Sequence, residues 1–245
     1  MDASRNGNFT SSELGALMSN GKKAGEPGKP FFTYIAEKNM ERRLGRALEN
    51  DTNAKPMNWG KVAEKRVFNI LGTTYQESSV ETIKHPRYDF WLGSPDGQKF
   101  DEGGTVLEIK CPFTLKSFCQ FIDATQGLEG ADAINSIREN HADGDKYYWQ
   151  IVSNSILLGT KYAELCIYCP YEAELDDVKA EASNMPVADL DKYYGLANSP
   201  NKDLPYLIEG KFYKNLNIIR WEVSQQDKTL LTERVLAAAK LLIQI

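Results

Sequence analysis

The chain has 245 residues, of which 42% are hydrophobic, 26% charged and 11% aromatic, and its formal net charge is −5. A chain of this length and composition can bury a full hydrophobic core, as one large domain or two small ones. No stretch approaches the roughly eighteen apolar residues needed to span a bilayer. The opening residues MDASRNGNFTSSE lack the apolar segment of a secretory signal. We therefore expect a soluble, cytoplasmic protein with no membrane partner.

Helix-like and strand-like patterns are mixed along the chain. Helical spacing of apolar residues predicts helices over 9–19, 31–50, 58–71, 114–123, 145–159 and 228–243. Short runs rich in β-branched and aromatic residues predict strands over 79–84, 88–92, 105–110, 162–168 and 217–223. This order predicts one domain over residues 1–245, of the α/β (α+β) class, with a central mixed β-sheet flanked by helices.

The negative charge is concentrated in one stretch. Residues 171–191 hold seven acids and one lysine, and we expect a partly irregular segment that is either a solvated face or a docking surface for a basic partner. Residues 1–66 carry twelve Lys and Arg against eight Asp and Glu. Because a locally basic face can exist on an acidic protein, the net charge does not exclude a nucleic-acid partner.

The segment SPDGQKFDEGGTVLEIKCPFT (94–114) carries the strongest candidate site. On a strand, residues i and i+2 share a face, so Glu108 and Lys110 project together while Ile109 leaves its carbonyl beside them. Asp96 lies in a turn before this strand, and a hairpin can bring it beside Glu108. Two carboxylates and a carbonyl form an oxygen-only site suited to Mg²⁺ or Mn²⁺. Lys110 could orient and help deprotonate a metal-bound water, as hydrolysis of a phosphodiester requires.

The same segment has a simpler interpretation. Ser94-Pro95-Asp96-Gly97 is a good turn sequence, and Glu108 with Lys110 could be a solvated strand face. The residues taken alone leave both interpretations open.

The cysteines and histidines predict no further site. The four cysteines are Cys111, Cys119, Cys166 and Cys169, and we expect reduced thiols in a chain of this size that is not secreted. Cys166 and Cys169 have zinc-ligand spacing, but on a strand their sulfurs would face opposite sides. His85 and His141 have no partner nearby in the sequence that suggests catalysis, so we expect packing or surface positions and no Ser-His-Asp hydrolase.

Five short motifs follow one another from residue 5 to residue 150. They are Arg5-x-Gly7-x-x-Thr10-x-Ser12-Glu13, Trp59-Gly60-Lys61 followed by Glu64, Ser94-Pro95-Asp96-Gly97, Leu107-Glu108-Ile109-Lys110-Cys111-Pro112-Phe113-Thr114, and Tyr147-Tyr148-Trp149-Gln150. In this order they resemble the lambda exonuclease branch of the PD-(D/E)xK nucleases, also grouped as YqaJ-type viral recombinases. The resemblance implies a restriction-endonuclease-like core. The last 90 or so residues match only in general outline.

The resemblance assigns the catalytic centre residue by residue. Asp96 and Glu108, with the carbonyl of Ile109, would hold one or two Mg²⁺ ions, with Mn²⁺ as a substitute. Lys110 would position the attacking water. Glu64, on the helix that begins near the Trp59 motif, would add a metal ligand or a water contact from the other side.

The resemblance also assigns supporting and end-binding residues. Gln150 would steady the nucleophile or the catalytic lysine, with Tyr147 packed nearby. Arg5, Ser12 and Ser94 would bind the terminal 5′-phosphate of the strand being degraded. This is physically reasonable, because free N–H groups of a first helical turn and a bidentate arginine both favour phosphate.

The function that the resemblance implies is a Mg²⁺-dependent 5′→3′ exonuclease on linear double-stranded DNA with 5′-phosphate ends. It would leave 3′ single-stranded tails for recombination by strand annealing. The family is typically phage-borne, so the protein would act in the host cytoplasm with a single-strand-annealing protein. It includes ring-shaped trimers, which implies a homo-oligomer. A ring would explain how an acidic protein holds DNA, since only the channel lining must be positive.

Three other functions stay open. An endonuclease of the same fold, of the restriction or repair type, would cut closed circular DNA without needing a 5′-phosphate. An iron–sulfur nuclease is disfavoured, because every cysteine lies at or after residue 111. A catalytically dead DNA-binding or assembly protein is disfavoured by the presence of Asp96, Glu108 and Lys110.

Overall fold

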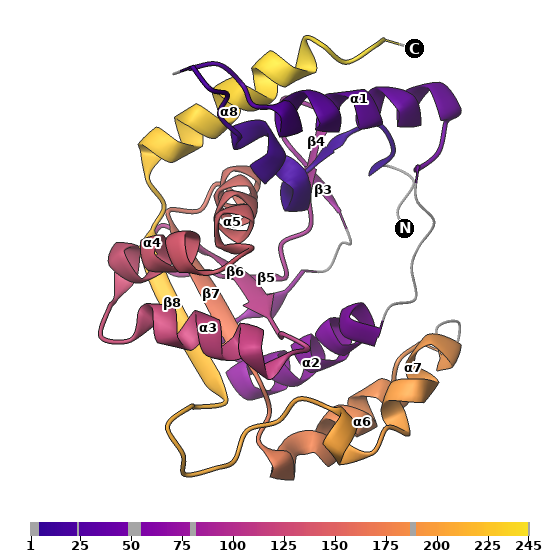
Figure 1. The fold of residues 1–245 in the computed structure, drawn as a ribbon, viewed down its shortest axis with the longest axis vertical. Coiled ribbons are helices and arrows are strands. Elements are labelled where there is room, and N and C mark those ends of the chain that lie inside the picture. The colour runs from indigo at the N-terminus through magenta and orange to yellow at the C-terminus, as the bar shows by residue number, and fades with distance from the viewer. Residues whose placement is uncertain (1–4, 24, 49–54, 79–81, 187–189, 245) are drawn as a thin grey trace.

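The computed structural model describes residues 5–23, 25–48, 55–78, 82–186 and 190–244. Its helices, with 3₁₀ helices written η, are η2 (Ser11–Met18), α1 (Lys29–Leu44), α2 (Lys55–Leu71), η3 (Gly72–Thr74), α3 (Leu115–Thr125), α4 (Gly130–Asn140), α5 (Gly144–Leu158), η4 (Glu172–Glu174), α6 (Leu175–Ser183), α7 (Leu190–Ala197), η6 (Asn201–Asp203) and α8 (Gln225–Ala239). Its strands are β1 (Phe9–Thr10), β2 (Gln76–Glu77), β3 (Ile83–Lys84), β4 (Trp91–Gly93), β5 (Gly97–Lys99), β6 (Thr105–Lys110), β7 (Tyr162–Tyr168) and β8 (Leu216–Glu222) (Figure 1).

A five-stranded sheet in the order β2-β5-β6-β7-β8 forms the centre of the fold. The pairs β2–β5, β5–β6 and β7–β8 are antiparallel, whereas β6 and β7 are parallel. The parallel pair needs a crossover, which α3, α4 and α5 supply. The predicted mixed sheet flanked by helices is therefore confirmed.

Strand β6 is central because its sequence suits burial on both faces. In TVLEIK every residue except Lys110 is buried. Val106 belongs to the core on the α5 side, and Leu107 and Ile109 belong to the core on the α2 side. Alternate residues of a strand face opposite sides, so Glu108 points toward α5 and away from α2.

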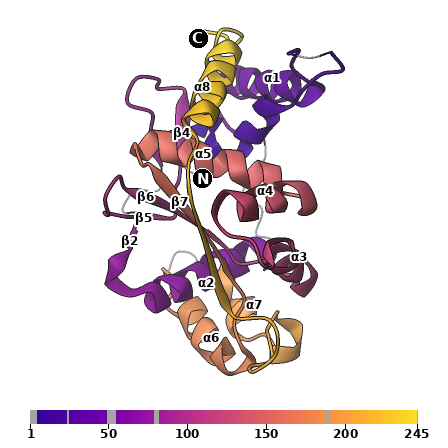
Figure 2. The same ribbon diagram turned by 90° about the vertical axis from the view of Figure 1, so that its left-hand side faces the viewer.

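Two hydrophobic clusters cover the two faces of the sheet. One cluster joins α1, α3, α4, α5 and α8, and the other joins α2, α6 and α7. Figure 1 shows α1 and α8 at one end of the molecule and α2, α6 and α7 toward the other. In Figure 2, β8 runs between these ends and leads into α8. Cys166 lies in the α2-side cluster and Cys169 in the other, so the two thiols do face opposite sides as predicted.

A second, small sheet carries the N-terminal part of the chain. Strand β4 pairs with β1 in parallel and with β3 antiparallel, in the order β1-β4-β3. Helix α5 packs against both β4 and η2. This helix also packs against β6 and β7, so it joins the small sheet to the central sheet.

Several predicted elements differ from the structure. The predicted helix 9–19 is strand β1 followed by 3₁₀ helix η2. Helix α1 ends at Leu44, because Gly45 adopts a left-handed conformation with φ of 67° that caps the helix. The predicted strand 88–92 begins only at Trp91, and the last helix begins at Gln225 and ends at Ala239. Of the predicted strand 79–84, residues 79–81 lie outside the described part.

Two helical regions were not predicted. Helix α4 buries Ala133, Ile134 and Ile137 on one face, a helical spacing within a polar sequence. The acidic stretch 171–191 is mostly helical in its described residues, as η4, α6 and the start of α7. Within the part of the chain that the structure describes, no helix is both long enough and apolar enough to cross a membrane.

Candidate active site

Asp96 lies in the turn between β4 and β5, and the β5–β6 hairpin brings it to the edge of β6. Gly97 pairs with Leu107 in the antiparallel hairpin, so the turn residue before Gly97 lies opposite Glu108 and next to Ile109. The Asp96 Oδ2 atom accepts a hydrogen bond of 2.6 Å from the Ile109 backbone N–H. The hairpin predicted from the sequence therefore forms, and it places one carboxylate against the strand that carries the other.

Glu108 is the most deeply enclosed charge of the site, with 1% of the residue exposed. Its Oε1 accepts hydrogen bonds from Lys110 Nζ at 2.6 Å and from Gln150 Nε2 at 2.5 Å. Its Oε2 accepts one from Asn154 Nδ2 at 3.2 Å. A buried carboxylate needs such partners, because burying an unpaired charge is costly. The interpretation of Glu108 as part of a solvated strand face is wrong.

Lys110 joins the carboxylates to helix α5. Its ammonium lies 4.6 Å from the ring centroid of Tyr147, within cation–π range. Burial by itself lowers the pKa of Lys110, but the charges of Glu108 and Asp96 outweigh burial and raise it. The side chain is therefore an ammonium at neutral pH. It can orient a water molecule or stabilise negative charge, but in this state it cannot take up a proton.

Glu64 approaches from α2, on the opposite face of the sheet from α5. Burial, followed by the charge of Glu108, raises the pKa of Glu64 to about 7. Burial and the charges of Glu108 and Glu64 also raise the pKa of Asp96 well above its usual value. Like charges held together disfavour ionisation. The site thus gathers more negative charge than Lys110 neutralises.

The structure does not bring Glu64 into one ligand set with Asp96 and Glu108. Among the described residues, no three His, Cys, Asp or Glu side chains gather closely enough to hold a metal ion. The Asp96 carboxylate is hydrogen-bonded to the Ile109 backbone, and Glu108 is held by Lys110 and by α5. The carboxylates that β6 and the preceding turn bring together are therefore Glu108 and Asp96, and Glu64 lies outside this pair.

Asn154 is a site residue that the sequence did not reveal. It is fully buried, and it lies one helical turn after Gln150, so both amides reach Glu108 from the same face of α5. Its Oδ1 is buried without a hydrogen-bond partner among the described residues. A Cβ atom on Gly93 would lie 2.6 Å from this oxygen, so the glycine leaves room for the amide. In the sequence, the four-residue spacing from Gln150 was the one feature that could have indicated Asn154 as a site residue.

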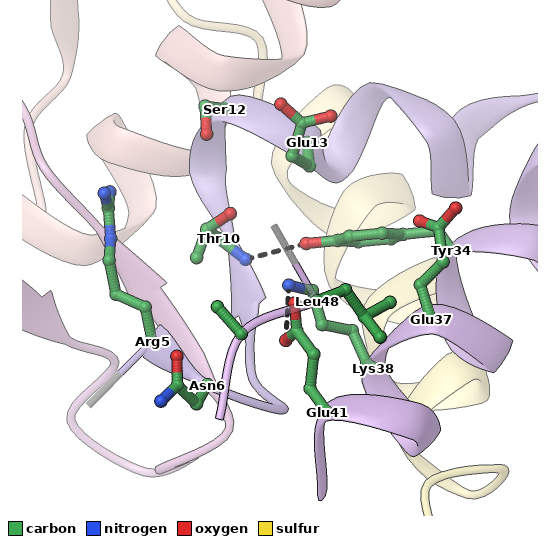
Figure 3. Close-up of a pocket in the computed structure, with 11 residues that line it drawn as sticks. Arg5, Asn6, Thr10, Ser12, Glu13, Tyr34, Glu37, Lys38, Glu41 and Leu48 are labelled. Atoms are coloured by element: carbon green, nitrogen blue, oxygen red, sulfur yellow. Dashed lines mark hydrogen bonds and ion pairs between the residues drawn. The ribbon is translucent and has the colours of Figure 1, made fainter. Parts of the chain in front are cut away.

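The predicted phosphate-binding residues lie close to one another. Arg5 Nη2 donates a hydrogen bond of 3.1 Å to Ser94 Oγ, two residues before Asp96. Arg5 and Ser12 line one cavity of about 380 Å³. Figure 3 shows Arg5 and Ser12 on one side of this cavity and Tyr34 with Glu37 on the other. The structure therefore brings together the three residues named from the sequence.

The cavity is not uniformly basic. Glu13, Glu37 and Glu41 also line it. Because like charges repel, a phosphate is favoured only at the Arg5 end. The Arg5 Nε atom is buried and has no hydrogen-bond partner among the described residues, so this guanidinium keeps an unused donor.

Both histidines are packing residues, as predicted. His141 stacks on Phe121 with ring centroids 3.9 Å apart, and its Nε2 lies 3.0 Å from Ser117 Oγ. His85 stacks between Tyr88 and Trp91. Burial lowers the pKa of both histidines, so both are neutral at pH 7.

Comparison with known proteins finds one matching family and several solved structures with a similar fold. The family model of the YqaJ-like viral recombinase domain matches residues 2–161. Among curated proteins, none matches the chain. LHK-Exo, an alkaline exonuclease from Laribacter hongkongensis, is similar in two solved structures. Its complex with dAMP has a TM-score of 0.58 at 20% identity, covering 98% of this chain and 90% of that chain. The second structure has a TM-score of 0.57 at 19% identity, with the same coverage.

A third solved structure, a phage related exonuclease from Haemophilus somnus 129PT, has a TM-score of 0.61 at 13% identity. It covers 96% of this chain and 92% of that chain. At these identities the likeness establishes a common fold over nearly the whole chain, including the last third that the family model does not match.

Proposed function

Because the chain belongs to the YqaJ-like viral recombinase family, we propose that it is a metal-dependent 5′→3′ exonuclease on linear double-stranded DNA. It degrades one strand from a 5′-phosphorylated end and leaves a 3′ single-stranded tail for recombination by strand annealing. The family and the exonuclease fold of the neighbours support a nuclease. We propose in addition the 5′→3′ direction of digestion, the preference for 5′-phosphorylated ends and the dependence on a metal ion.

One observation carries the proposal. Glu108 is buried in a sheet centre, held by Lys110 and two α5 amides, with Asp96 beside the same strand. A fold that only needed stability would gain little from this cluster, because replacing buried charges by apolar residues is often neutral or stabilising. A carboxylate pair with a lysine is suited to phosphodiester hydrolysis with a divalent cation.

The residues present fit a divalent cation. Asp96 and Glu108 supply hard oxygen donors, and the Ile109 carbonyl points to the same strand edge as the N–H that Asp96 accepts. Burial, followed by repulsion between the carboxylates, raises the pKa of Asp96 and of Glu64, and a bound cation would offset that repulsion. When bound, Mg²⁺ or Mn²⁺ would activate water and stabilise the charge on the phosphate.

Residues of the chain itself supply the other catalytic and positioning roles. Lys110, held as an ammonium over Tyr147, stabilises negative charge on the reacting phosphate and orients the attacking water. Gln150 and Asn154 fix the Glu108 carboxylate from α5. Glu64, on α2, would add a metal ligand or a water contact from the other side of the sheet.

Recognition of the DNA end is assigned to Arg5, Ser12 and Ser94. The unused Nε donor of Arg5 and its contact with Ser94 support a phosphate at this position. Ser94 is two residues from Asp96, so an anchored 5′-phosphate would lie near the carboxylates. The neighbour LHK-Exo was solved with dAMP, a nucleoside monophosphate, which supports release of mononucleotides here.

The proposal extends to partners. Double-stranded DNA is the substrate, a single-strand-annealing protein is the functional partner, and the host cytoplasm is the place of action. We also propose a homo-oligomer, with the trimeric ring as the specific form. The mass of the protein in solution tests the ring.

The decisive experiment compares three DNA substrates, each with Mg²⁺ and with EDTA. The substrates are a linear duplex with 5′-phosphoryl ends, the same duplex with 5′-hydroxyl ends, and a closed circle. We expect rapid release of mononucleotides from the phosphorylated duplex, slow digestion of the hydroxyl ends, little cutting of the circle, and no digestion in EDTA.

Other results assign another function. Cutting of the circle at a rate comparable to the linear duplex would replace the exonuclease by an endonuclease of the same fold. Binding of DNA without cleavage of any substrate would indicate a catalytically inactive assembly protein.

A further inference from the structure

The segment that carries Arg5 is attached to helix α1. The backbone N–H of Gly7 donates to Glu41 Oε2 at 2.8 Å. The backbone N–H of Thr10 donates to the Tyr34 hydroxyl at 3.0 Å. Glu41 is buried and is paired with Lys38 at 2.9 Å. One face of α1 therefore holds the chain on the C-terminal side of Arg5.

Arg42 makes the most contacts of this kind, because its guanidinium donates in three directions. Its Nε donates to the Gly7 carbonyl at 2.7 Å, and its Nη2 donates to Asn8 Oδ1 at 3.2 Å. Its Nη1 donates to the Ile243 carbonyl at 2.9 Å. Only a planar guanidinium offers donors at these three positions at once. The arginine thus connects the N-terminal turn to Ile243, which lies 201 residues after Arg42 itself.

Gly7 adapts the backbone to this arrangement. Its φ of 69° lies in the left-handed region, and a Cβ atom there would lie 2.4 Å from Arg42 Cγ. The N–H of Asn8 donates to the carbonyl of Arg5 at 3.2 Å, which closes the turn. A side chain at Gly7 would displace either the turn or Arg42, so the two are built to lie in contact.

The segment near residue 243 is attached to the same turn of α1. Asn39 Nδ2 donates to the Leu241 carbonyl at 3.0 Å, and the Ile243 N–H donates to Asn39 Oδ1 at 2.8 Å. Asn39 and Arg42 are three residues apart, so they lie on one face of the helix. Residues 241–243 therefore limit the positions that the Arg42 side chain can take.

We propose that Arg42 is a positioning residue for recognition of the DNA 5′-phosphate. It holds the turn that carries Arg5, and residues 241–243 hold Arg42. The inference rests on the proposed function, because it assigns the phosphate to Arg5. It adds that the preference for 5′-phosphorylated ends depends on a residue that touches neither the phosphate nor the carboxylates.

The test is the ratio of two initial rates, digestion of 5′-phosphoryl ends over digestion of 5′-hydroxyl ends, with Mg²⁺. We compare the wild-type protein with Arg42→Gln, and with Arg43→Gln as the matched control on the adjacent, exposed position. We expect Arg42→Gln to lower the ratio about fivefold or more, because the phosphate contact contributes only with phosphorylated ends. Arg43→Gln leaves the ratio within about twofold of wild type.

Two further variants keep the test decisive. Arg42→Lys keeps the charge but not the three donors, so we expect a ratio between those of wild type and Arg42→Gln. A chain that ends at Lys240 keeps Arg42 but lacks the residues that hold it, and its ratio falls in the same direction. If Arg42→Gln does not fold, as judged by thermal unfolding, these two variants carry the test.

The possible failures are distinguishable. If the wild-type protein does not distinguish the two kinds of end, the end recognition in the proposed function is wrong, and this inference with it. If the wild-type protein prefers phosphorylated ends and Arg42→Gln keeps that preference, only the role of Arg42 is wrong. An equal loss of both rates would also contradict it, because a general structural role changes both rates alike.

Discussion

Two buried glutamates on neighbouring strands of the central sheet have opposite surroundings. Glu164 on β7 is 3% exposed and pairs with Arg220 at 2.8 Å, while the Tyr75 hydroxyl donates to its second oxygen at 2.6 Å. Arg220 also reaches Asp101 at 2.9 Å. Glu108 on β6 is 1% exposed and has a lysine partner, but Asp96 and Glu64 lie close enough to repel it.

The pKa values of Asp101 and Asp96 are shifted in opposite directions by these surroundings. Burial raises the pKa of Asp101, but hydrogen bonds from Thr105 and Arg220 outweigh burial and lower it. Burial and the charges of Glu108 and Glu64 raise the pKa of Asp96, and Lys110 only partly opposes them. In the first network Arg220 is bonded to both carboxylates, whereas in the second Lys110 is bonded only to Glu108.

The comparison separates a structural network from a functional one. The Arg220 network satisfies its charges within the chain, so it ties the β5–β6 hairpin to β7 and β8. The proposed cation would stabilise the Glu108 cluster by offsetting the repulsion between its carboxylates. A buried cluster in which burial and like charges raise the pKa values of two carboxyl groups is a candidate functional site on physical grounds. Paired substitutions in the two networks test this distinction.

The largest expected effect concerns the two aspartates. We expect Asp96→Asn to lower the rate of DNA cleavage by about a thousandfold, equivalent to about 4 kcal/mol of transition-state stabilisation, because a metal ligand is lost. The matched variant Asp101→Asn keeps the cleavage rate within about threefold. Initial rates on a 5′-phosphorylated linear duplex measure both.

A second readout of the same pair does not need activity. In the wild-type protein we expect Mg²⁺ to raise the unfolding temperature at pH 8, since a ligand that binds the folded state stabilises it. Asp96→Asn should lose most of this increase, and Asp101→Asn should keep it. Retention of a tenth or more of the wild-type cleavage rate in Asp96→Asn would contradict the assigned role.

The next largest effect is on stability and concerns Arg220. Arg220→Gln leaves Glu164 buried without its cation, and we expect the free energy of unfolding to fall by about 2–3 kcal/mol. This value is at the lower end of the range for buried pairs because 37% of the Arg220 side chain is exposed. Urea unfolding measures it, with Arg43→Gln as the exposed-arginine control. An unchanged midpoint would show that the network contributes no stability.

The smallest expected effect depends on pH. The pKa of Glu64 is about 7 in the folded protein and about 4.5 without its surroundings. A raised carboxyl pKa stabilises the folded state fully below pH 4.5, and this stabilisation is lost as the pH rises through 7. In EDTA, we therefore expect the stability of Glu64→Gln relative to wild type to increase by about 2 kcal/mol between pH 4.5 and pH 8.

This prediction has its own control. Glu13→Gln changes an exposed glutamate whose partner is Lys146 at the surface, so its stability relative to wild type should stay nearly constant over the same pH range. Urea unfolding at several pH values gives both curves. A flat curve for Glu64→Gln would mean that Glu64 is not held against the other carboxylates.

Local pattern determined most of the secondary structure that surrounds the site. The strand over 105–110 and the strand over 162–168 were predicted with their observed bounds, because dense β-branched and aromatic residues fit only a buried strand. The helix predicted over 145–159 is α5 at Gly144–Leu158. The placement of Asp96 beside the strand that carries Glu108 also followed from the sequence, since a turn directly before an antiparallel pair leaves few alternatives.

Only the tertiary structure shows which side chains and backbone groups hold Glu108 and Arg42 in place. Asn154 reaches Glu108 from 46 residues away, and Arg42 reaches Ile243 from 201 residues away. Neither contact has a local signature, because helical spacing fixes which residues share a face but not what that face meets. The raised pKa values of Asp96 and Glu64 could not be predicted either, since burial is their largest cause. The sequence alone determined the strands, the hairpin and the carboxylates, because each depends on neighbours in the chain. Their burial, pairing and pKa values depend on segments that meet only in the folded protein.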